Sequence, residues 1–260
     1  MTGVQTCALP ILLGEERARL VFGDGPYNIP IDGFVSGTGR HREFVMGAGE
    51  MSPPEFTAFQ RAIFRNCVRF SVSGSIHFQC MDWRHMREML DAADGVYSEF
   101  KQLIVWAKQS GAMGTFYRSR HELVFVFKSG KGKHVNNFVL GDTGRYRTNV
   151  VEYAGANSFR KGRAADLAAH STVKPLALVA DFLLDCSNRG DLVVDPFCGS
   201  GTTLIAAHRT QRWAASIELD PGYVDVALER LRAVTGIQPV LDRDGRGFDA
   251  VKAARLGGED

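Results

Sequence analysis

The sequence predicts an α/β fold in which a doubly wound, mostly parallel sheet is covered by helices on both faces. The first observation is the stretch from Asp191 to Asp220, which reads as an apolar strand, a glycine turn, a helix and a second strand that ends near Glu218. The second is that short apolar runs of strand length alternate with amphipathic runs that suit helices along the rest of the chain. The third is the length of 260 residues, which allows one domain with a large core and a small insertion.

Composition is that of a soluble globular protein. Hydrophobic residues make up 45% of the chain and charged residues 23%. No apolar run approaches the roughly 20 residues that a membrane-spanning helix needs. The five cysteines are scattered, odd in number and without C-x-x-C spacing, which argues against a disulfide framework and against a zinc site. We therefore expect a cytoplasmic protein with no metal and no membrane contact.

Charge is unevenly distributed along the chain. The net charge is only +2, but residues 101–163 hold twelve Lys or Arg against three Asp or Glu, so the remaining residues are net −7. An excess of nine positive charges in one segment favours a polyanionic partner over a merely solvated surface.

Both ends of the chain are expected to lie outside the domain. Residues 1–11 have no basic start and a proline inside their short apolar stretch, so they make a poor signal peptide. They resemble a translated cloning scar, and we expect a non-native or disordered leader ahead of a fragment whose native start lay upstream. Residues 12–236 should form a single domain, and the glycine-rich, charged residues 237–260 a tail that frays from Asp242.

The first predicted strand, Arg17–Phe22, leads directly into a turn. The turn consists of Asp24, Gly25, Pro26 and Tyr27. In isolation, D-G-P-Y is merely a good turn sequence. At the carboxyl end of a predicted strand, it becomes a candidate active site.

A glycine-rich loop and a helix follow this turn. Residues 31–51 carry the basic triplet Arg40-His41-Arg42. They are equally consistent with a loop that orders over the site on DNA and with a plain surface loop. Ser52 is a candidate cap for a helix over residues 55–67.

The middle of the domain contains three more predicted strands. A helix over residues 83–93 separates a strand at 75–80 from a strand at 101–108. The next strand, at 122–128, is apolar throughout residues 123–127, which predicts a central position with both faces covered.

Residues 130–169 form the candidate DNA-recognition insertion. The segment is basic and irregular, and Tyr146, Tyr153 and Phe159 stand between its basic residues. This composition suits phosphate contacts and base stacking. The last elements are an apolar helix over 176–186 and an amphipathic helix over 221–232.

Three motifs, taken in order, resemble those of one family. They are D-G-P-Y at 24–27, H-x-T-x-K-P at 170–175, and D-P-F-x-G-S-G-T-T at 195–203 followed by Glu218. This order resembles the β group of DNA amino-methyltransferases, and the resemblance covers residues 17–234. It implies a seven-stranded sheet of the S-adenosylmethionine-dependent methyltransferase type, with a circularly permuted motif order. The strands that end at the first and third motifs should then be neighbours.

The resemblance implies S-adenosylmethionine as the cofactor and S-adenosylhomocysteine as the product. The glycines would wrap the methionine portion, and Glu218 would accept hydrogen bonds from both ribose hydroxyls. The cofactor-binding residues carried over are Asp195, Phe197, Cys198, Gly199, Ser200, Gly201, Thr202, Glu218, Thr172, Lys174 and Pro175.

The same resemblance assigns catalysis to Asp24, Gly25, Pro26 and Tyr27. The Asp24 carboxylate and the Gly25 carbonyl would accept the hydrogens of an exocyclic amine and aim its lone pair at the methyl donor. Tyr27 would stack on a base flipped out of double-stranded DNA. Asp at the first position favours N6 of adenine over N4 of cytosine.

Gly25 stands where the family has proline, which keeps the carbonyl but loosens the turn. A catalytically impaired DNA-binding relative is therefore an alternative, as is an N4-cytosine methyltransferase. An enzyme acting on RNA, protein or a small molecule is another. A nicotinamide dehydrogenase is disfavoured because Leu204 occupies the third glycine position of its fingerprint. A homodimer is compatible with the sequence, which decides neither the oligomeric state nor the recognition site.

Overall fold

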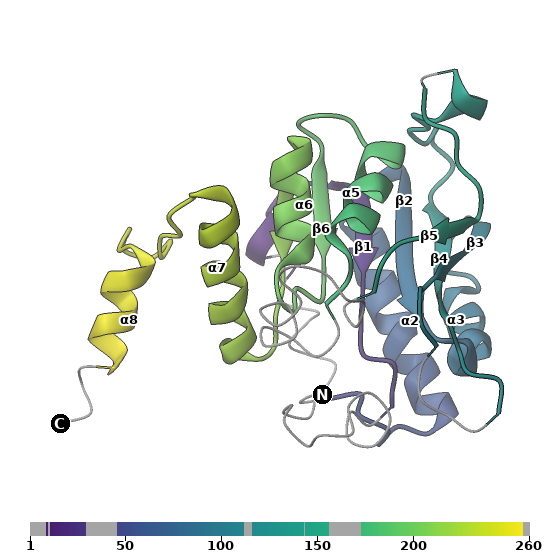
Figure 1. The fold of residues 1–260 in the computed structure, drawn as a ribbon, viewed down its shortest axis with the longest axis horizontal. Coiled ribbons are helices and arrows are strands. Elements are labelled where there is room, and N and C mark those ends of the chain that lie inside the picture. Colours follow the sequence, from purple (N-terminus) through teal and green to yellow (C-terminus); the bar gives the residue numbers. More distant parts are fainter. Residues whose placement is uncertain are drawn as a thin grey trace.

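A seven-stranded sheet forms the centre of the part of the chain that the computed structural model describes, which is residues 9, 11–29, 46–111, 116–142, 144–155 and 173–256 (Figure 1). The strands are β1 (Ala18–Gly23), β2 (Ser71–Met81), β3 (Glu99–Ala107), β4 (His121–Ser129), β5 (Val150–Glu152), β6 (Leu192–Asp195) and β7 (Trp213–Ser216). They lie in the order β5-β3-β4-β2-β1-β6-β7. β4 runs antiparallel to both neighbours and every other neighbouring pair is parallel. The predicted mostly parallel, seven-stranded α/β fold is therefore confirmed.

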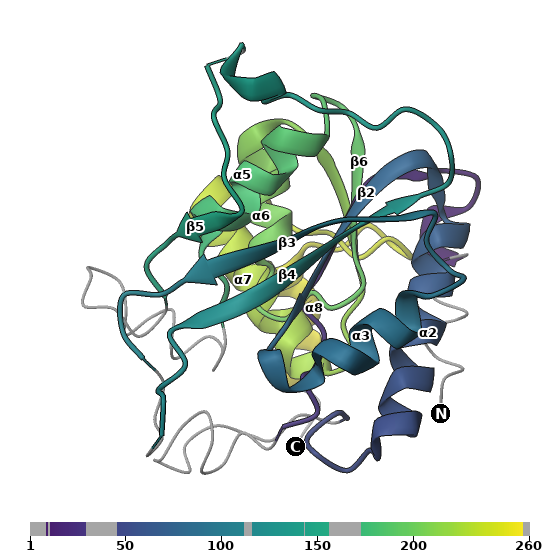
Figure 2. The same cartoon turned by 90° about the vertical axis from the view of Figure 1, so that its right-hand side faces the viewer.

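Helices cover both faces of the sheet (Figure 2). α2 (Pro53–Arg69) and α3 (Met86–Ala93) pack on one face, and α5 (Leu176–Cys186) and α6 (Thr202–Thr210) pack on the other. β4 contributes to both layers, because successive side chains of a strand point to opposite faces. Phe125 and Phe127 join the core under α2, whereas Val124 and Val126 join the core under α5. An all-apolar strand thus takes the central position that its sequence predicts.

The two ends of the described chain depart from expectation. Leu9, inside the predicted leader, is buried in the same core layer as α2. Beyond α7 (Pro221–Thr235), the tail expected to fray from Asp242 forms the helix α8 (Phe248–Leu256). α8 has no buried residues and projects away from the sheet in Figure 1. The sequence did not predict this helix, because it lies among glycine-rich, charged residues and lacks the apolar face that marks a helix packed on a core.

The connections that leave β1 and β6 turn to opposite faces of the sheet. From β1 the chain passes to α2 on one face, and from β6 it enters α6 on the other. β1 and β6 are parallel neighbours, so their carboxyl ends meet at a topological switch point. Ligands of such sheets bind at this place, and we call the region beside these strand ends the crevice. Asp24 follows β1 and Asp195 ends β6, so the two carboxylates terminate neighbouring strands as the sequence predicts.

The segment after β4 crosses the opposite end of the sheet. Because β4 is reversed, it ends at Ser129 opposite Ser75, near the start of β2. Residues 130–149, which we call the strap, therefore lie at the amino ends of the parallel strands and include the short 3-10 helix η2 (Val139–Gly141). Figures 1 and 2 show η2 at the top of the molecule. The predicted insertion continues to residue 169, but residues 156–169 lie outside the described part of the chain.

Within the ranges that the structure describes, no helix combines the length and apolar character needed to cross a membrane.

Candidate active site

The D-G-P-Y turn at the end of β1 is anchored by the residue that follows it. Asn28 has a positive φ of 54°, in the left-handed region that asparagine tolerates better than most residues. Its Nδ2 donates to the Met51 carbonyl at 2.8 Å, and its Oδ1 accepts from the backbone N–H groups of Gly49 and Met51, each at 3.2 Å. These bonds tie the turn to the residues before α2. The basic triplet Arg40-His41-Arg42 lies outside the described residues.

The side chain of Asp24 belongs to a group of four charged residues that we call the Asp24 cluster (Asp24, Lys108, Glu122 and Lys174). The Nζ of Lys174 lies 2.7 Å from Oδ1 of Asp24 and 3.0 Å from Oε2 of Glu122. Lys108 pairs with the other carboxylate oxygen of Glu122. The hydroxyl of Tyr27 donates to Oε2 of Glu122 at 3.0 Å and lies 3.3 Å from Oδ1 of Asp24. One network therefore connects the ends of β1 and β3 with the start of β4 and the approach to α5.

Aromatic rings enclose the two lysines. The Nζ of Lys174 lies 5.3 Å from the ring centre of Tyr27 and 6.0 Å from that of Trp106, and the Nζ of Lys108 lies 4.9 Å from the Trp106 ring. Trp106 is buried and donates from Nε1 to the Tyr153 carbonyl at 2.9 Å. Lys174 thus covers one face of the Tyr27 ring, which is also packed against both core layers.

Burial and neighbouring charges set the protonation of the cluster. Burial raises the pKa of Asp24, an effect that Lys174 opposes and Glu122 reinforces. Burial alone would also raise the pKa of Glu122, but Lys174 and Lys108 lower it to about 2. Burial would lower the pKa of Lys174, yet Asp24 and Glu122 raise it. Glu122 and Lys174 therefore stay ionised at neutral pH, and the charge of Asp24 is the least firmly held.

Asp24 keeps one oxygen for an outside partner. Both of the contacts that the described residues make with its carboxylate go to Oδ1. Its side chain is 19% exposed, whereas that of Lys174 is 7% exposed. Oδ2 can therefore accept an N–H from a molecule that enters the crevice.

The glycine turn after β6 is shaped by Asp195 and two left-handed glycines. Oδ1 of Asp195 accepts the backbone N–H of Phe197 at 2.9 Å, and burial raises the pKa of this carboxyl to about 7. Gly199 and Gly201 have φ values of +50° and +77°, which favour glycine. A Cβ on Gly201 would also lie only 3.1 Å from the Cβ of Ala227 in α7. The turn therefore needs glycine for its backbone and for close packing.

Glu218, just after β7, reaches across to the same turn. Its Oε2 accepts the N–H of Gly199 at 2.7 Å, and its Oε1 accepts the N–H groups of Leu219 and Asp220 at 2.8 and 2.9 Å. These bonds fix the carboxylate beside the crevice. Glu218 is half-buried, and its one remaining lone pair, on Oε2, is accessible to a ligand.

Two of the predicted cofactor residues, Ser200 and Thr202, are bound by Arg230 of α7. Its Nη1 donates to the carbonyl and hydroxyl oxygens of Ser200 at 3.1 and 2.9 Å, and to the hydroxyl of Thr202 at 2.9 Å. Both of these side chains are buried, so their hydroxyls hold the turn against α7. The turn residues that remain half-buried, and thus open to a ligand, are Phe197, Cys198 and Gly199.

The D-G-P-Y turn and the glycine turn touch each other. A Cβ added to Gly25 would lie 2.8 Å from the ring carbon Cε2 of Phe197. The backbone of one turn therefore rests against a side chain of the other. Asp24 and Gly199 thus border the same crevice.

Three predicted residues from the H-x-T-x-K-P motif have different outcomes. Lys174, predicted to bind the cofactor, lies with the D-G-P-Y residues in the Asp24 cluster. Pro175 is half-buried directly before α5. Thr172 lies outside the described residues. Across the described ranges, no three His, Cys, Asp or Glu side chains are gathered as ligands of a metal ion.

Glu122 and Lys108 were not among the predicted site residues. Glu122 reaches the site because β4 is antiparallel to β3 and pairs it with Trp106. The order of residues along the chain gives no sign of this pairing. One feature of the sequence could have indicated a role for Glu122. It stands at the start of an otherwise apolar strand, where a buried charge needs a partner.

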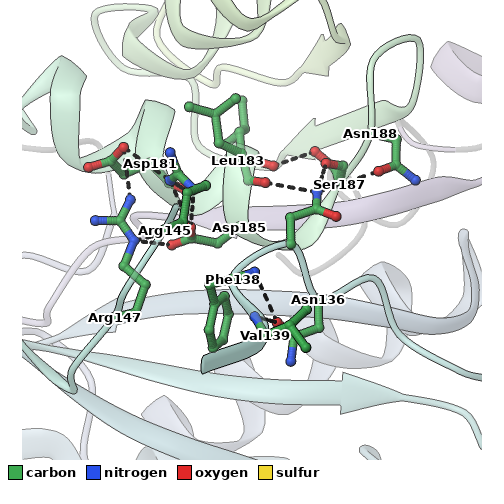
Figure 3. A network of polar contacts seen from close by, with 12 residues as sticks. Asn136, Phe138, Val139, Arg145, Arg147, Asp181, Leu183, Asp185, Ser187 and Asn188 are labelled. Atoms are coloured by element: carbon green, nitrogen blue, oxygen red, sulfur yellow. Dashed lines mark hydrogen bonds and ion pairs between the residues drawn. The ribbon is translucent and has the colours of Figure 1, made fainter. Parts of the chain in front are cut away.

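A second group of four charged residues, the Asp185 cluster, joins Arg145 and Arg147 of the strap to Asp181 and Asp185 of α5 (Figure 3). Arg145 Nη2 lies 2.7 Å from Asp185 Oδ1, and Arg147 Nε lies 2.9 Å from Asp185 Oδ2. Arg147 Nη2 also lies 2.9 Å from Asp181 Oδ1, and the Tyr153 hydroxyl donates to Asp181. Two of the cations that predicted a polyanionic partner are therefore bound to α5.

The strap is fastened to α5 at a second point and covers a cavity. The Nδ2 of Asn137 donates to the carbonyls of Leu184 and Ser187, each at 2.9 Å. Between the sheet and α5 lies a cavity of about 230 Å³, with Phe78 and Phe182 among its apolar lining residues. This part of the predicted recognition insertion thus packs against the sheet and α5, away from the crevice.

Comparison with known proteins places most of the chain in one family. Residues 18–229 match the family described as DNA methylase, of the N6/N4 type. The chain is 26% identical over 255 residues to the type II methyltransferase M.HpaI of Haemophilus parainfluenzae, covering 92% of this chain and 73% of that protein. It is 32% identical over 90 residues to the type II methyltransferase M.ScaI of Streptomyces caespitosus, covering 35% of this chain and 30% of that protein.

Solved structures share the fold. The PvuII DNA methyltransferase (cytosine-N4-specific) superposes with a TM-score of 0.66 at 17% identity, covering 89% of each chain. The M1.HpyAVI-SAM complex superposes with a TM-score of 0.64 at 18% identity, covering 88% of this chain and 95% of that one.

Proposed function

This chain belongs to the N6/N4 DNA methylase family, and we propose that it is a site-specific DNA methyltransferase that transfers a methyl group from S-adenosylmethionine to N6 of adenine. The observation that carries this proposal is the contact between the turn that holds Asp24, whose Oδ2 no described residue binds, and the glycine turn after β6. Asp24, the first residue of the D-G-P-Y turn, supports adenine as the target. The family members that it resembles at this position methylate adenine more often than cytosine. Double-stranded DNA is the proposed partner.

The residues of the glycine turn fit S-adenosylmethionine. Gly199 offers backbone without a side chain at the crevice, and Glu218 is a fixed carboxylate whose free lone pair on Oε2 suits a ribose hydroxyl. Relatives of the same fold are named as complexes with this cofactor, namely M1.HpyAVI and TTHA0409 of Thermus thermophilus. When bound, S-adenosylmethionine supplies a methyl group on a positively charged sulfur.

The chain's own residues orient the target amine. A flipped base stacks on Tyr27. Oδ2 of Asp24 accepts one amine N–H and the Gly25 carbonyl accepts the other, which directs the nitrogen lone pair out of the base plane. The proton lost from the methylated amine is accepted at Oδ2. Lys174 and Glu122 hold Asp24 and Tyr27 in place through the contacts at Oδ1 and at the phenol hydroxyl.

Methylation of cytosine N4 is the second candidate. The structural similarity to an enzyme named as cytosine-N4-specific favours it. The pair of acceptors at Asp24 and Gly25 suits either exocyclic amine. A third outcome, a DNA-binding relative with impaired catalysis, follows from the glycine at position 25.

Expression in a host without DNA methylation, followed by nucleoside digestion and sequencing of modified bases, tests these candidates. We expect N6-methyladenine within one short sequence motif, and none with the variant Asp24→Ala. N4-methylcytosine alone would replace adenine by cytosine as the target. No modified base, from a purified chain that binds both S-adenosylmethionine and DNA, would identify the impaired relative.

A further inference from the structure

Two neighbouring aromatic side chains project into solvent from the connection between β3 and β4. Tyr117 is 91% exposed and Phe116 is 86% exposed, and within the described ranges no large hydrophobic side chain is more exposed. Their rings pack edge to face with centres 4.7 Å apart. Isolated exposed apolar residues are common, but two adjacent rings that contact mainly each other form an apolar surface that a partner can cover.

These rings stand on the rim of the Asp24 site. They lie in the connection from β3 to β4, whose strands pair Ala107 with His121 at the carboxyl end of the parallel strands. Lys108, just outside that pair, and Glu122, just inside it, both belong to the Asp24 cluster. Figure 2 shows this connection reaching beyond the end of the sheet opposite η2.

The residues next to the rings are cationic and exposed. Arg118 and Arg120 follow directly and both side chains reach the surface. Arg118 also bonds to the Gly111 carbonyl at 3.0 Å, which supports the connection from within. A duplex offers both complementary surfaces, with phosphates for guanidinium groups and flat bases for aromatic rings.

From this placement we propose that Phe116 and Tyr117 insert against the bases beside the target nucleotide and stabilise the duplex after that nucleotide has flipped out. Flipping removes the stacking partner of the neighbouring bases, and an apolar wedge can replace it. Arg118 and Arg120 contact the adjacent phosphates. The inference rests on the proposed function, since it needs DNA at the crevice.

The strap supplies a matched control. Tyr146 is 73% exposed and is likewise flanked by arginines, but it lies at the opposite end of the sheet. Its neighbours Arg145 and Arg147 are paired with α5. An exposed aromatic residue in the wrong place should contribute nothing to base flipping.

The test compares the full-length chain with the double variant Phe116→Ala/Tyr117→Ala and with Tyr146→Ala. The substrates are a matched duplex containing the methylated motif and the same duplex with the target base mispaired. On the matched duplex we expect the double variant to lose about tenfold or more in kcat/KM, the order of one stacked base. On the mispaired duplex, where the base is already unpaired, the loss should be at most about threefold. Tyr146→Ala should match the unaltered chain on both.

Two outcomes would overturn the wedge: no loss in the double variant, or an equal loss on both duplexes. Duplex binding, measured in parallel by fluorescence anisotropy with amplified DNA, separates this inference from the proposed function. If the unaltered chain binds duplex DNA without methylating it, and the double variant binds less tightly, the wedge is supported and the enzymatic proposal is contradicted. A chain that neither binds nor methylates duplex DNA removes both.

Discussion

Two clusters of charged side chains at opposite ends of the sheet are built from the same kinds of groups. The Asp24 cluster and the Asp185 cluster each join two carboxylates, two cations and one tyrosine hydroxyl. Each also connects elements that are distant in sequence. The two clusters therefore contain nearly the same functional groups, although the Asp24 cluster borders the proposed active site and the Asp185 cluster fastens the strap to α5.

The clusters differ in the bonding capacity that remains. In the Asp185 cluster, planar guanidinium groups satisfy both oxygens of Asp185, with Arg147 at 2.9 Å from Oδ2 and Arg145 at 2.7 Å from Oδ1. In the Asp24 cluster, lysine ammonium groups act as compact charges and leave Oδ2 of Asp24 without a partner among the described residues. A cluster whose carboxylate is satisfied holds elements together, whereas one with an available acceptor can also bind a substrate.

Replacing Asp24 by Asn should give the largest effect. We expect kcat/KM to fall by about 1,000-fold, because the amide lacks the charge that accepts the amine proton. Lys174 keeps Glu122 as a partner, so the variant should fold and bind S-adenosylmethionine. Methyl transfer to DNA and calorimetric cofactor binding are the measurements. Activity within tenfold of the unaltered chain would show that Asp24 is not the acceptor.

The matching change in the Asp185 cluster, Asp185→Asn, should lower stability and leave activity unchanged. Among the described residues, Asp185→Asn leaves Arg145 and Arg147 with Asp181 as their one charged partner, and the Asp185 side chain is 7% exposed. We expect the free energy of unfolding in urea to fall by about 2 kcal/mol, with kcat/KM unchanged. Glu99→Gln, which breaks an exposed pair with Lys101, is the control and should change stability little. A large loss of activity in folded Asp185→Asn would mean that the clusters are functionally linked.

A smaller effect is expected from Gly25→Pro, which tests how closely the D-G-P-Y turn rests on the glycine turn. The new Cβ would overlap the Phe197 ring, so we expect a loss of about 1 to 2 kcal/mol in stability. The double variant Gly25→Pro/Phe197→Leu should recover most of it. Thermal unfolding and methyl transfer are measured together. If Gly25→Pro instead creates activity where there was none, the natural chain is an impaired relative.

The sequence predicted what depends on local pattern. The strand, glycine turn and helix from Leu192 to Thr210 follow from apolar runs and glycine positions, and the neighbouring ends of β1 and β6 follow from the motif order. These features require only that nearby residues interact with each other. They also include the residues that define the crevice.

The roles of the charged residues were not predictable in the same way. The count of basic residues in 101–163 treats Lys108, Arg118 and Arg147 alike. In the structure, Lys108 supports the Asp24 cluster, Arg118 bonds to Gly111 within the connection from β3 to β4, and Arg147 binds α5. Whether a cation is paired depends on strand register and helix position, which composition does not record. The short strand β5 was missed for a related reason, because only its pairing with β3 identifies it.

The subtlest expected difference between the clusters lies in how each titrates. Glu122 raises the pKa of Asp24 and Lys174 lowers it, so their removal should move that pKa in opposite directions. If ionised Asp24 accepts the amine proton, activity rises with pH through this pKa. Glu122→Gln should therefore shift the acid limb of the kcat/KM profile to lower pH, and Lys174→Met should shift it to higher pH.

Opposite shifts distinguish an electrostatic role from a merely structural one, since loss of packing would lower activity at every pH without moving the limb. Asp181→Asn, in the distant cluster, is the matched control and should leave the limb unchanged. Shifts of the same sign for Glu122→Gln and Lys174→Met would show that the acid limb reports another group, such as Asp195, whose pKa burial raises to about 7. In that case, the available oxygen of Asp24 would bind the amine without its titration controlling the rate.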